Sequence, residues 1–249
     1  MGDINQAAEF ARRAGDVLMR LRAEAEISGL AGQELKNAGD RAAQDFLAQQ
    51  LRRYYPNDAV LSEEATDDSA RLHSERVWII DPLDGTREYS EFRKDFAVHV
   101  ALWERGELTA GAVALPGRGE VLTSQPEPGG LHLQKDSLRI AVSRTRAPEL
   151  VHCIGSELGA TLVPMGSAGY KICSLIRGEA DIYLHAGGQY EWDSAAPVAV
   201  AQAYGLHASR INGDPLEYNM PNPYLPDLLI CHPQHAGRIL DLIGSFEPA

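Results

Sequence analysis

Acidic residues that could hold a divalent cation gather in four short segments of this chain. The clearest is the run VWIIDPLDGT at residues 77–86, where an apolar stretch ends in Asp81 and Asp84, three residues apart around Pro82. Proline fixes φ and stiffens the turn, while Gly85 lets a ligand approach the backbone closely. The turn could therefore present both carboxylates to one point. A plain strand-ending turn is the alternative, because Pro and Asp-Gly are common turn formers.

The other three segments each place acid near the end of an expected element. The run SEEA supplies Glu63 and Glu64 after a short apolar strand, and EWDSAA supplies Asp193. Asp193 and Asp40 each fall in what reads as the first turn of a helix, where the helix dipole favours an acid. Taken singly, these features are typical of a solvated turn and two ordinary helix starts.

Together, these acids would form a ligand set of oxygen atoms, because the four segments contain no histidine or cysteine. Such a set selects a hard cation, and Mg²⁺ takes a few carboxylates together with substrate phosphate. A bound cation of this kind lowers the pKa of a coordinated water and neutralises developing negative charge. Grouped carboxylates repel one another without metal, so we expect added Mg²⁺ to stabilise the protein.

Hydrophobic spacing predicts the elements that must position these acids. Helices are expected over residues 4–25 and 40–55, the second beginning at Gly39-Asp40, and short strands over 59–65 and 77–84. An antiparallel meander is expected from four β-like runs, which are FAVHVALWE, LTAGAVALP, GEVLTSQ and GLHLQ. From residue 139 onward, strands alternate with helices. We therefore expect an α+β protein with the active site in a cleft between an N-terminal subdomain (1–138), carrying most metal ligands, and a C-terminal α/β subdomain (139–249), carrying substrate-side residues.

In their order along the chain, Asp40, SEE, DPLDGT and EWDSAA resemble the motifs of the inositol monophosphatase superfamily of magnesium-dependent, lithium-sensitive phosphatases. The resemblance covers nearly the whole chain. It implies the layered α/β/α/β/α sandwich of the inositol monophosphatase and fructose-1,6-bisphosphatase type. It also implies two or three Mg²⁺ ions in each site and inhibition by Li⁺. A monomer and a homodimer both stay open.

The resemblance implies a role for each matching residue. The positions that match metal ligands, including one backbone carbonyl at Leu83, are Glu63, Asp81, Leu83, Asp84 and Asp193. Thr86 and Asp40 match the pair that orients and deprotonates the attacking water, with Glu64 behind them. The N–H groups of Gly85 and Thr86 match the cradle for the scissile phosphate.

The C-terminal half further resembles the CysQ-type branch, which acts on 3′-phosphoadenosine 5′-phosphate. The matching stretches are AVSRTR, GSAGYKIC, GEADIYLHAGGQYEWDSAAP and DPLEYNMPNPYLPD, of which PLEYN followed by NPYLPD is the most specific to the branch. By this resemblance, Ser167 and Lys171 hold the second phosphate. A helix cap and a surface lysine are the alternative roles for these two residues.

Three positions depart from that branch. Ala38 stands where the branch has a threonine two residues before the acid matched by Asp40, and the spacing from Gly-Ser to Lys171 is one residue longer. His185 replaces an arginine on the substrate side. Histidine pairs with phosphate more weakly than a guanidinium does, and in a pH-dependent way. This departure bears on the preference for bisphosphates, whereas phosphatase activity depends on the acidic motifs.

The expected function is a Mg²⁺-dependent phosphomonoesterase that removes the 3′-phosphate of adenosine 3′,5′-bisphosphate, leaving AMP, with 3′-phosphoadenylyl sulfate as a second candidate substrate. This would place the protein in sulfur assimilation. Inositol monophosphate, histidinol phosphate and fructose 1,6-bisphosphate are alternative substrates on the same fold. A non-catalytic nucleotide or metal sensor is the alternative of a different class, and the water-orienting pair Thr86 and Asp40 argues against it.

The overall charge restricts the partners. The 249 residues carry a formal net charge of −12, which argues against a nucleic-acid surface or a polybasic membrane patch. The N-terminal segment lacks an apolar signal core, and no window approaches the roughly 20 apolar residues of a membrane span, so we expect a cytoplasmic protein. Its expected partner is a small phosphorylated molecule, and bound Mg²⁺ would reverse the sign of the acidic cleft.

Overall fold

The computed structural model describes residues 2–125, 137–145 and 147–246. The strands form two five-stranded sheets, ordered β1-β2-β3-β4-β5 and β7-β6-β8-β10-β9. The first sheet contains β1 (Ala59–Ser62), β2 (Arg76–Asp84), β3 (Ala97–Glu104), β4 (Glu107–Leu115) and β5 (Glu120–Thr123). The second contains β6 (Arg139–Ser143), β7 (Thr161–Met165), β8 (Ile182–Tyr190), β9 (His207–Ser209) and β10 (Tyr224–Cys231).

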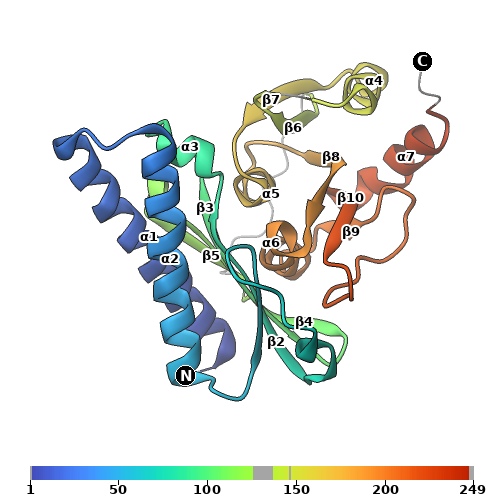
Figure 1. The fold of residues 1–249 in the computed structure, drawn as a ribbon. Helices are drawn as coiled ribbons and strands as arrows, with labels where there is room; N and C mark the ends of the chain where they lie inside the picture. The colour runs from blue at the N-terminus through green and yellow to red at the C-terminus, as the bar shows by residue number, and fades with distance from the viewer. Residues whose placement is uncertain (1, 126–136, 146, 247–249) are drawn as a thin grey trace.

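Helices cover both sheets and separate them, as Figure 1 shows. They are α1 (Asp3–Ser28), α2 (Gly32–Tyr54), α3 (Thr86–Ser90), α4 (Glu149–Leu158), α5 (Ala168–Ile176), α6 (Glu191–Ala203) and α7 (Pro233–Gly244), with short 3₁₀ turns η1 (Ser69–His73) and η2 (Pro116–Arg118). Among the helices of the described segments, none is both long and apolar enough to cross a membrane.

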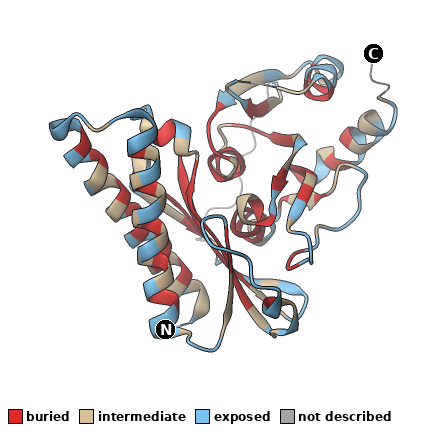
Figure 2. Ribbon diagram, in the orientation of Figure 1, coloured by how far each residue is buried: buried red, intermediate tan, exposed pale blue. Residues whose placement is uncertain are grey.

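The helices and the two sheets form five layers, and three apolar clusters fill the spaces between them. One lies between α1, α2 and the first sheet, a second surrounds α5 and α6 between the two sheets, and a third joins the second sheet to α4 and α7. Figure 2 shows these buried residues on the facing sides of the elements. Burying one face of each outer helix and both faces of each sheet is what a layered α/β domain requires. The predicted α/β/α/β/α sandwich is confirmed.

Most predicted elements of the N-terminal half are present. Strands β3, β4 and β5 pair antiparallel, as the meander prediction required, whereas β1 pairs parallel with β2. The fourth β-like run, GLHLQ at residues 130–134, lies outside the described residues.

The predicted start of the second helix was wrong. The helix α2 begins at Gly32, so Asp40 lies inside it and not in its first turn. The sequence ahead of Asp40 contains good helix formers, which carry the helix through Gly39. Gly39 serves packing: a Cβ there would lie 2.7 Å from Tyr89 Cε1 and 3.0 Å from Leu83 Cδ2. The missing side chain lets α2 lie directly against the DPLDGT turn.

Candidate metal centre

A β-bulge in β2 turns Asp81 and Asp84 to the same face of the first sheet. Asp81 pairs with His99 of β3 and Asp84 with Ala97, so a step of three residues on β2 faces a step of two on β3. Residues three apart on a regular strand lie on opposite faces, and the extra residue of a bulge reverses this. Pro82 fits the irregular position because it has no N–H to donate to the ladder.

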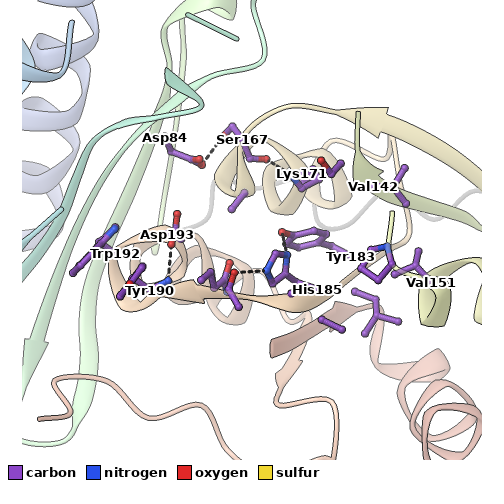
Figure 3. Close-up of a pocket in the computed structure, with 18 of the residues that line it drawn as sticks. Asp84, Val142, Val151, Ser167, Lys171, Tyr183, His185, Tyr190, Trp192 and Asp193 are labelled. Atoms are coloured by element: carbon purple, nitrogen blue, oxygen red, sulfur yellow. Dashed lines mark hydrogen bonds between the residues drawn. The ribbon is translucent and has the colours of Figure 1, made fainter. Parts of the chain in front are cut away.

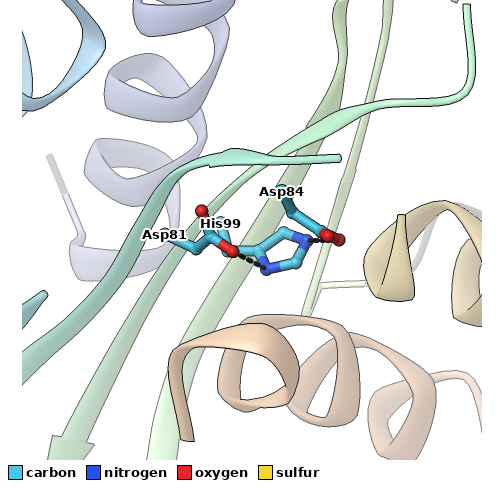
Figure 4. Close-up of side chains that lie close together, drawn as sticks. All are labelled: Asp81, Asp84 and His99. Atoms are coloured by element: carbon cyan, nitrogen blue, oxygen red, sulfur yellow. Dashed lines mark ion pairs between the residues drawn. The ribbon is translucent and has the colours of Figure 1, made fainter. Parts of the chain in front are cut away.

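The ring of His99 lies between the two aspartates, as Figure 4 shows. Its Nε2 is 3.2 Å from Asp84 Oδ2, and its Nδ1 is 3.9 Å from Asp81 Oδ2. Nδ1 also lies 3.1 Å from the carbonyl oxygen of Trp192, next to Asp193. Within the described residues, Asp81, Asp84 and His99 form a group whose candidate ligand atoms all lie within 4.8 Å of one another.

The sequence motifs gave no indication of this histidine, which the structure places between two of the predicted ligands. His99 is remote from the acidic motifs in sequence and becomes their neighbour only through the pairing of β3 with β2. A signal was present in FAVHVALWE, where one histidine interrupts an apolar strand. Such a residue is usually hydrogen-bonded in a core, and here its bonding partners belong to the site.

Four carboxylates lie close enough to influence one another's ionisation. Burial, followed by the charges of Glu63, Asp84 and Asp193, raises the pKa of Asp81 well above its ordinary value. Although Glu63 is exposed, partial desolvation and the charge of Asp193 raise its pKa to about 7. Burial and the charge of Asp84 raise the pKa of Asp193 to about 6. Neighbouring like charges disfavour ionisation in this way. The acids from three separate segments thus converge on one place.

Asp84 differs from its neighbours because it has its own donors. Burial opposes its charged form, but His99, the Ser167 hydroxyl and the Gly169 N–H together lower its pKa to about 2. Ser167 Oγ donates to Asp84 Oδ2 at 2.5 Å, and the Gly169 N–H donates to the same oxygen at 2.7 Å. The start of α5 thus stabilises a charged Asp84, in keeping with the positive end of a helix.

Asp40 and Thr86 meet beside the bulge. Thr86 Oγ1 lies 3.4 Å from Asp40 Oδ1 and 3.2 Å from the carbonyl oxygen of Leu83. Burial and the charge of Glu64 raise the pKa of Asp40 to about 6, although the Thr86 hydroxyl opposes this. Gly85 supports the turn with a φ of 87°, a conformation that glycine adopts without strain. The predicted water-orienting pair is therefore adjacent, and α2 supplies one member from a helix interior.

A cavity of about 720 Å³ opens from the acids toward the second sheet. Glu63, Asp84 and Asp193 line one part of it, while Val142, Val151 and Leu184 contribute apolar surface. Figure 3 shows Asp84, Ser167, Lys171 and the Tyr183–His185 pair around this space. Three of the acids therefore line one part of the cavity, and the apolar side chains that line another part can contact the uncharged portion of a ligand.

Ser167 and Lys171 both lie at the cavity, with their polar groups already partly engaged. Ser167 caps α5 by accepting from the Tyr170 N–H at 3.0 Å, with a φ of 48°. Lys171 is buried, so it is not the surface lysine of the alternative interpretation. Its Nζ donates to the Ser167 carbonyl at 2.8 Å and lies 5.3 Å from the centre of the Tyr183 ring. Burial lowers the pKa of Lys171.

His185 also lines the cavity, but both of its nitrogens have partners. Nδ1 lies 3.3 Å from the Tyr183 hydroxyl and Nε2 3.1 Å from the Gly188 carbonyl oxygen. Burial lowers the pKa of His185, which favours a neutral ring. A phosphate would have to displace one of these partners to reach it.

The acids fit a divalent cation. Asp81 Oδ2 is buried and has no hydrogen-bond partner among the described residues. The charges of Glu63, Asp84 and Asp193 disfavour the charged form of Asp81. Carboxylate oxygens at the mouth of a cavity are the donors that Mg²⁺ prefers. The residues that could hold such ions are Glu63, Asp81, Leu83 through its carbonyl, Asp84 and Asp193.

The layered fold and the acidic site define a family. The chain belongs to the inositol monophosphatase family, whose sequence profile matches residues 3–244. It is 51% identical over 244 residues to a Mycobacterium tuberculosis protein named 3′-phosphoadenosine 5′-phosphate phosphatase, covering 93% of this chain and 90% of that one. A Mycobacterium leprae protein of the same name is 47% identical over 257 residues, covering 97% and 93% of the two chains.

Solved structures share the fold. CysQ from Bacteroides thetaiotaomicron matches with a TM-score of 0.78 and 24% identity, covering 91% of this chain and 96% of that chain. Inositol monophosphatase from Anabaena matches with a TM-score of 0.77 and 21% identity, covering 98% and 96%. At this level of identity the structural similarity shows the fold alone. The titles of both structures name inositol monophosphatase or its family, in agreement with the sequence profile.

Proposed function

We propose that this protein is a Mg²⁺-dependent phosphomonoesterase that hydrolyses the 3′-phosphate of adenosine 3′,5′-bisphosphate, with 3′-phosphoadenylyl sulfate as a second substrate. The observation that carries the proposal is the convergence of Glu63, Asp81, Asp84 and Asp193. All of these except Asp81 line a cavity that is also lined by the buried Lys171. The names of the mycobacterial relatives support the choice of substrate.

In this proposal the ligand set holds two or three Mg²⁺ ions, and Li⁺ inhibits by competing for the same oxygens. When bound, the ions supply positive charge that activates water and neutralises the leaving oxygen. The bulge in β2 keeps Asp81 and Asp84 on one face, and the start of α5 fixes the orientation of Asp84. Orientation of ligands by such surrounding hydrogen bonds is a general requirement of metal sites.

Thr86 and Asp40 act on the attacking water. The Thr86 hydroxyl orients it, and Asp40 accepts its proton directly or through Thr86, with which it already shares a contact. A carboxyl with a pKa of about 6 accepts protons well near neutral pH. Glu64 acts through Asp40, because its charge contributes to that raised pKa. The N–H groups of Gly85 and Thr86 bind the scissile phosphate.

The remainder of the substrate occupies the cavity between the two halves of the chain, 1–138 and 139–249. Lys171 and Ser167 bind the second phosphate, and His185 contributes only when it releases the Gly188 carbonyl. Lys171 keeps part of its donor capacity free because an ammonium has three N–H groups. The apolar side chains Val142, Val151 and Leu184 contact the nucleoside.

Initial rates of phosphate release test the proposal. The substrates are adenosine 3′,5′-bisphosphate, inositol monophosphate, histidinol phosphate and fructose 1,6-bisphosphate, each with Mg²⁺, with EDTA and with Li⁺ added to Mg²⁺. We expect the highest kcat/KM for the adenosine bisphosphate, no turnover in EDTA and inhibition by Li⁺. Higher kcat/KM for another substrate would reassign the specificity, and full activity in EDTA would exclude the metal mechanism.

A further inference from the structure

The PLEYN segment, residues 215–219, is docked on the first turn of α6. Glu191, the first residue of that helix, accepts the Asn219 N–H at 2.6 Å through Oε2 and the Met220 N–H at 2.8 Å through Oε1. The hydroxyls of Tyr218 and Ser194 lie 3.1 Å apart. Asp193 stands between Glu191 and Ser194 in sequence, so this segment fixes the helix turn on both sides of a candidate metal ligand.

Arg71 joins this segment to the N-terminal half. Its side chain is 1% exposed, and Nη1 donates to Asn219 Oδ1 at 2.7 Å while Nη2 donates to the Met220 carbonyl at 2.9 Å. Nε and Nη2 also donate to the two oxygens of Asp67, at 2.7 and 3.0 Å. A planar guanidinium can hold a carboxylate and two further acceptors at once, which an ammonium cannot do in the same geometry.

The loop that Arg71 anchors is acidic and little packed. Residues 64–70 are all exposed, and the stretch that begins at Glu63 carries Glu64, Asp67 and Asp68. Like charges in an exposed loop repel one another and have little buried apolar surface to resist the repulsion. The buried cation at the end of this loop supplies an opposite charge and a rigid contact to the C-terminal half.

Asparagine suits position 219 both by its backbone conformation and by its two hydrogen bonds. Its φ of 61° lies in the left-handed region, where asparagine is tolerated far better than most residues. Its side-chain oxygen accepts from Arg71 and its backbone N–H donates to Glu191. One residue thus connects the loop that begins at Glu63 with the helix that carries Asp193.

We propose that Arg71 and Asn219 are positioning residues, which hold Glu63 and Asp193 at a fixed separation and thereby set the affinity of the site for a divalent cation. This inference rests on the proposed metal site. Arg71 and Asn219 act through the loop and the helix, and the hydrogen bonds described engage the Arg71 guanidinium nitrogens, the Asn219 side-chain oxygen and the Asn219 backbone N–H. The segment most specific to the branch in sequence thus acquires a physical role outside the cavity.

The test compares Arg71→Met with Arg139→Met. Arg139 is a matched control because it also forms a paired contact with an aspartate, donating to Asp181 at 3.1 and 3.2 Å, in the second sheet. For metal-free wild type and both variants, the dissociation constant for Mg²⁺ is measured by titration calorimetry, and Tm is measured in EDTA. We expect the Arg71 variant to bind Mg²⁺ about tenfold more weakly, as loss of outer contacts does at other metal sites. The Arg139 variant should lose Tm and keep the wild-type dissociation constant.

A second variant tests the inference even if Arg71→Met fails to fold. Asn219→Gly keeps the positive φ and the N–H to Glu191 and removes the acceptor for Arg71, so it should weaken Mg²⁺ binding with a small change in Tm. Wild-type Mg²⁺ affinity in Arg71→Met or in Asn219→Gly would overturn the inference and leave the proposed function intact. Failure of the wild type to bind Mg²⁺ would instead overturn the proposed function, and the inference with it.

Discussion

Asp81 is the residue with the greatest electrostatic conflict in the site. It is buried, one of its oxygens lacks a partner among the described residues, and three neighbouring carboxylates disfavour its charge. We expect Asp81→Asn to stabilise the metal-free protein and to abolish the response of Tm to Mg²⁺. Each kcal/mol of repulsion removed raises Tm by about 2–4 °C in a protein of this size. Thermal unfolding in EDTA and in Mg²⁺ measures both effects.

The control for this variant is Asp45→Asn, which removes an exposed acid from α2. It changes the net charge equally and should leave the Mg²⁺ response intact. A metal-free Tm that falls in Asp81→Asn would show that the carboxylate makes a favourable contact in the absence of metal. Phosphate release that survives in Asp81→Asn would contradict the proposed mechanism.

Lys171 carries a prediction about substrate choice. Its buried ammonium lies at the cavity and contacts backbone carbonyls and the Tyr183 ring. We expect Lys171→Met to raise KM for adenosine 3′,5′-bisphosphate by about 10–100-fold, because a charged hydrogen bond contributes about 1.5–3 kcal/mol. The kcat/KM for a substrate with one phosphate, such as inositol monophosphate, should change little. Steady-state kinetics on both substrates measures the difference, and an equal loss for both would assign Lys171 a structural role.

At the same scale, the sequence was enough to predict the acidic candidates, but not the residues that surround them in the structure. The motif letters indicated Asp81, Asp84 and Thr86 as candidates, because each belongs to a short run whose chemistry can be read locally, and the structure places them at one turn. His99 could not be identified in this way, since its contact with Asp84 depends on strand register and on the bulge. The pairing of Arg71 with Asn219 spans 148 positions, and no local pattern indicates it.

At the scale of elements, Gly39 controls the contact between α2 and the DPLDGT turn. Replacing an exposed helical glycine by alanine stabilises a helix by about 1 kcal/mol. At Gly39 the new Cβ would lie 2.7 Å from Tyr89 Cε1, so we expect Gly39→Ala to destabilise the protein by about 1–3 kcal/mol, as overpacking does. Displacement of α2 should also separate Asp40 from Thr86 and lower kcat.

Gly237 in α7 is the matched control for this variant. It is exposed in a helix, and a Cβ there meets nothing within 4 Å, so Gly237→Ala should stabilise the protein and leave kcat unchanged. Denaturant unfolding of the metal-free proteins gives both free energies. Equal effects of the two substitutions would contradict the close packing at Gly39.

The error in the predicted start of α2 has the same physical origin. In sequence, Gly-Asp reads as a helix boundary, because glycine is a poor helix former and aspartate favours a first turn. The structure uses Gly39 for close approach and Asp40 for its position beside Thr86. Strands β2 and β3 were predicted well because their apolar runs are long and are bounded by polar turns. The short strand β9 has three residues and no comparable signal.

At the scale of the whole molecule, the acids couple metal binding to pH. The pKa is raised to about 7 for Glu63 and to about 6 for Asp40 and Asp193, so these three groups bind more protons in the folded metal-free protein than in the unfolded chain between about pH 4 and 7. These groups therefore stabilise the metal-free fold at low pH, and their contribution is lost as pH rises through 6 and 7. A cation requires the charged carboxylates, so it competes with those protons.

Within the described part of the chain, three histidines change stability with pH in the opposite direction, and their effect must be distinguished from that of the acids. Burial lowers the pKa of His185, His207 and His232, so their contribution to stability grows as pH rises toward 6.5. They are present with and without metal, and the difference between the two unfolding free energies removes most of their effect. That difference is the quantity that reports on the carboxylates.

We expect the stabilisation by a fixed Mg²⁺ concentration to increase from pH 5 to pH 8 and to level off above about pH 8. Each tenfold gain in affinity as the acids ionise adds about 1.4 kcal/mol. Denaturant unfolding in Mg²⁺ and in EDTA at each pH gives the difference directly. Asp193→Asn should reduce both the stabilisation and its pH dependence, because it removes one titrating ligand, whereas Asp45→Asn should change neither. A stabilisation that stays constant across this range would mean that the ion binds without displacing protons, which is incompatible with Glu63 and Asp193 as its ligands.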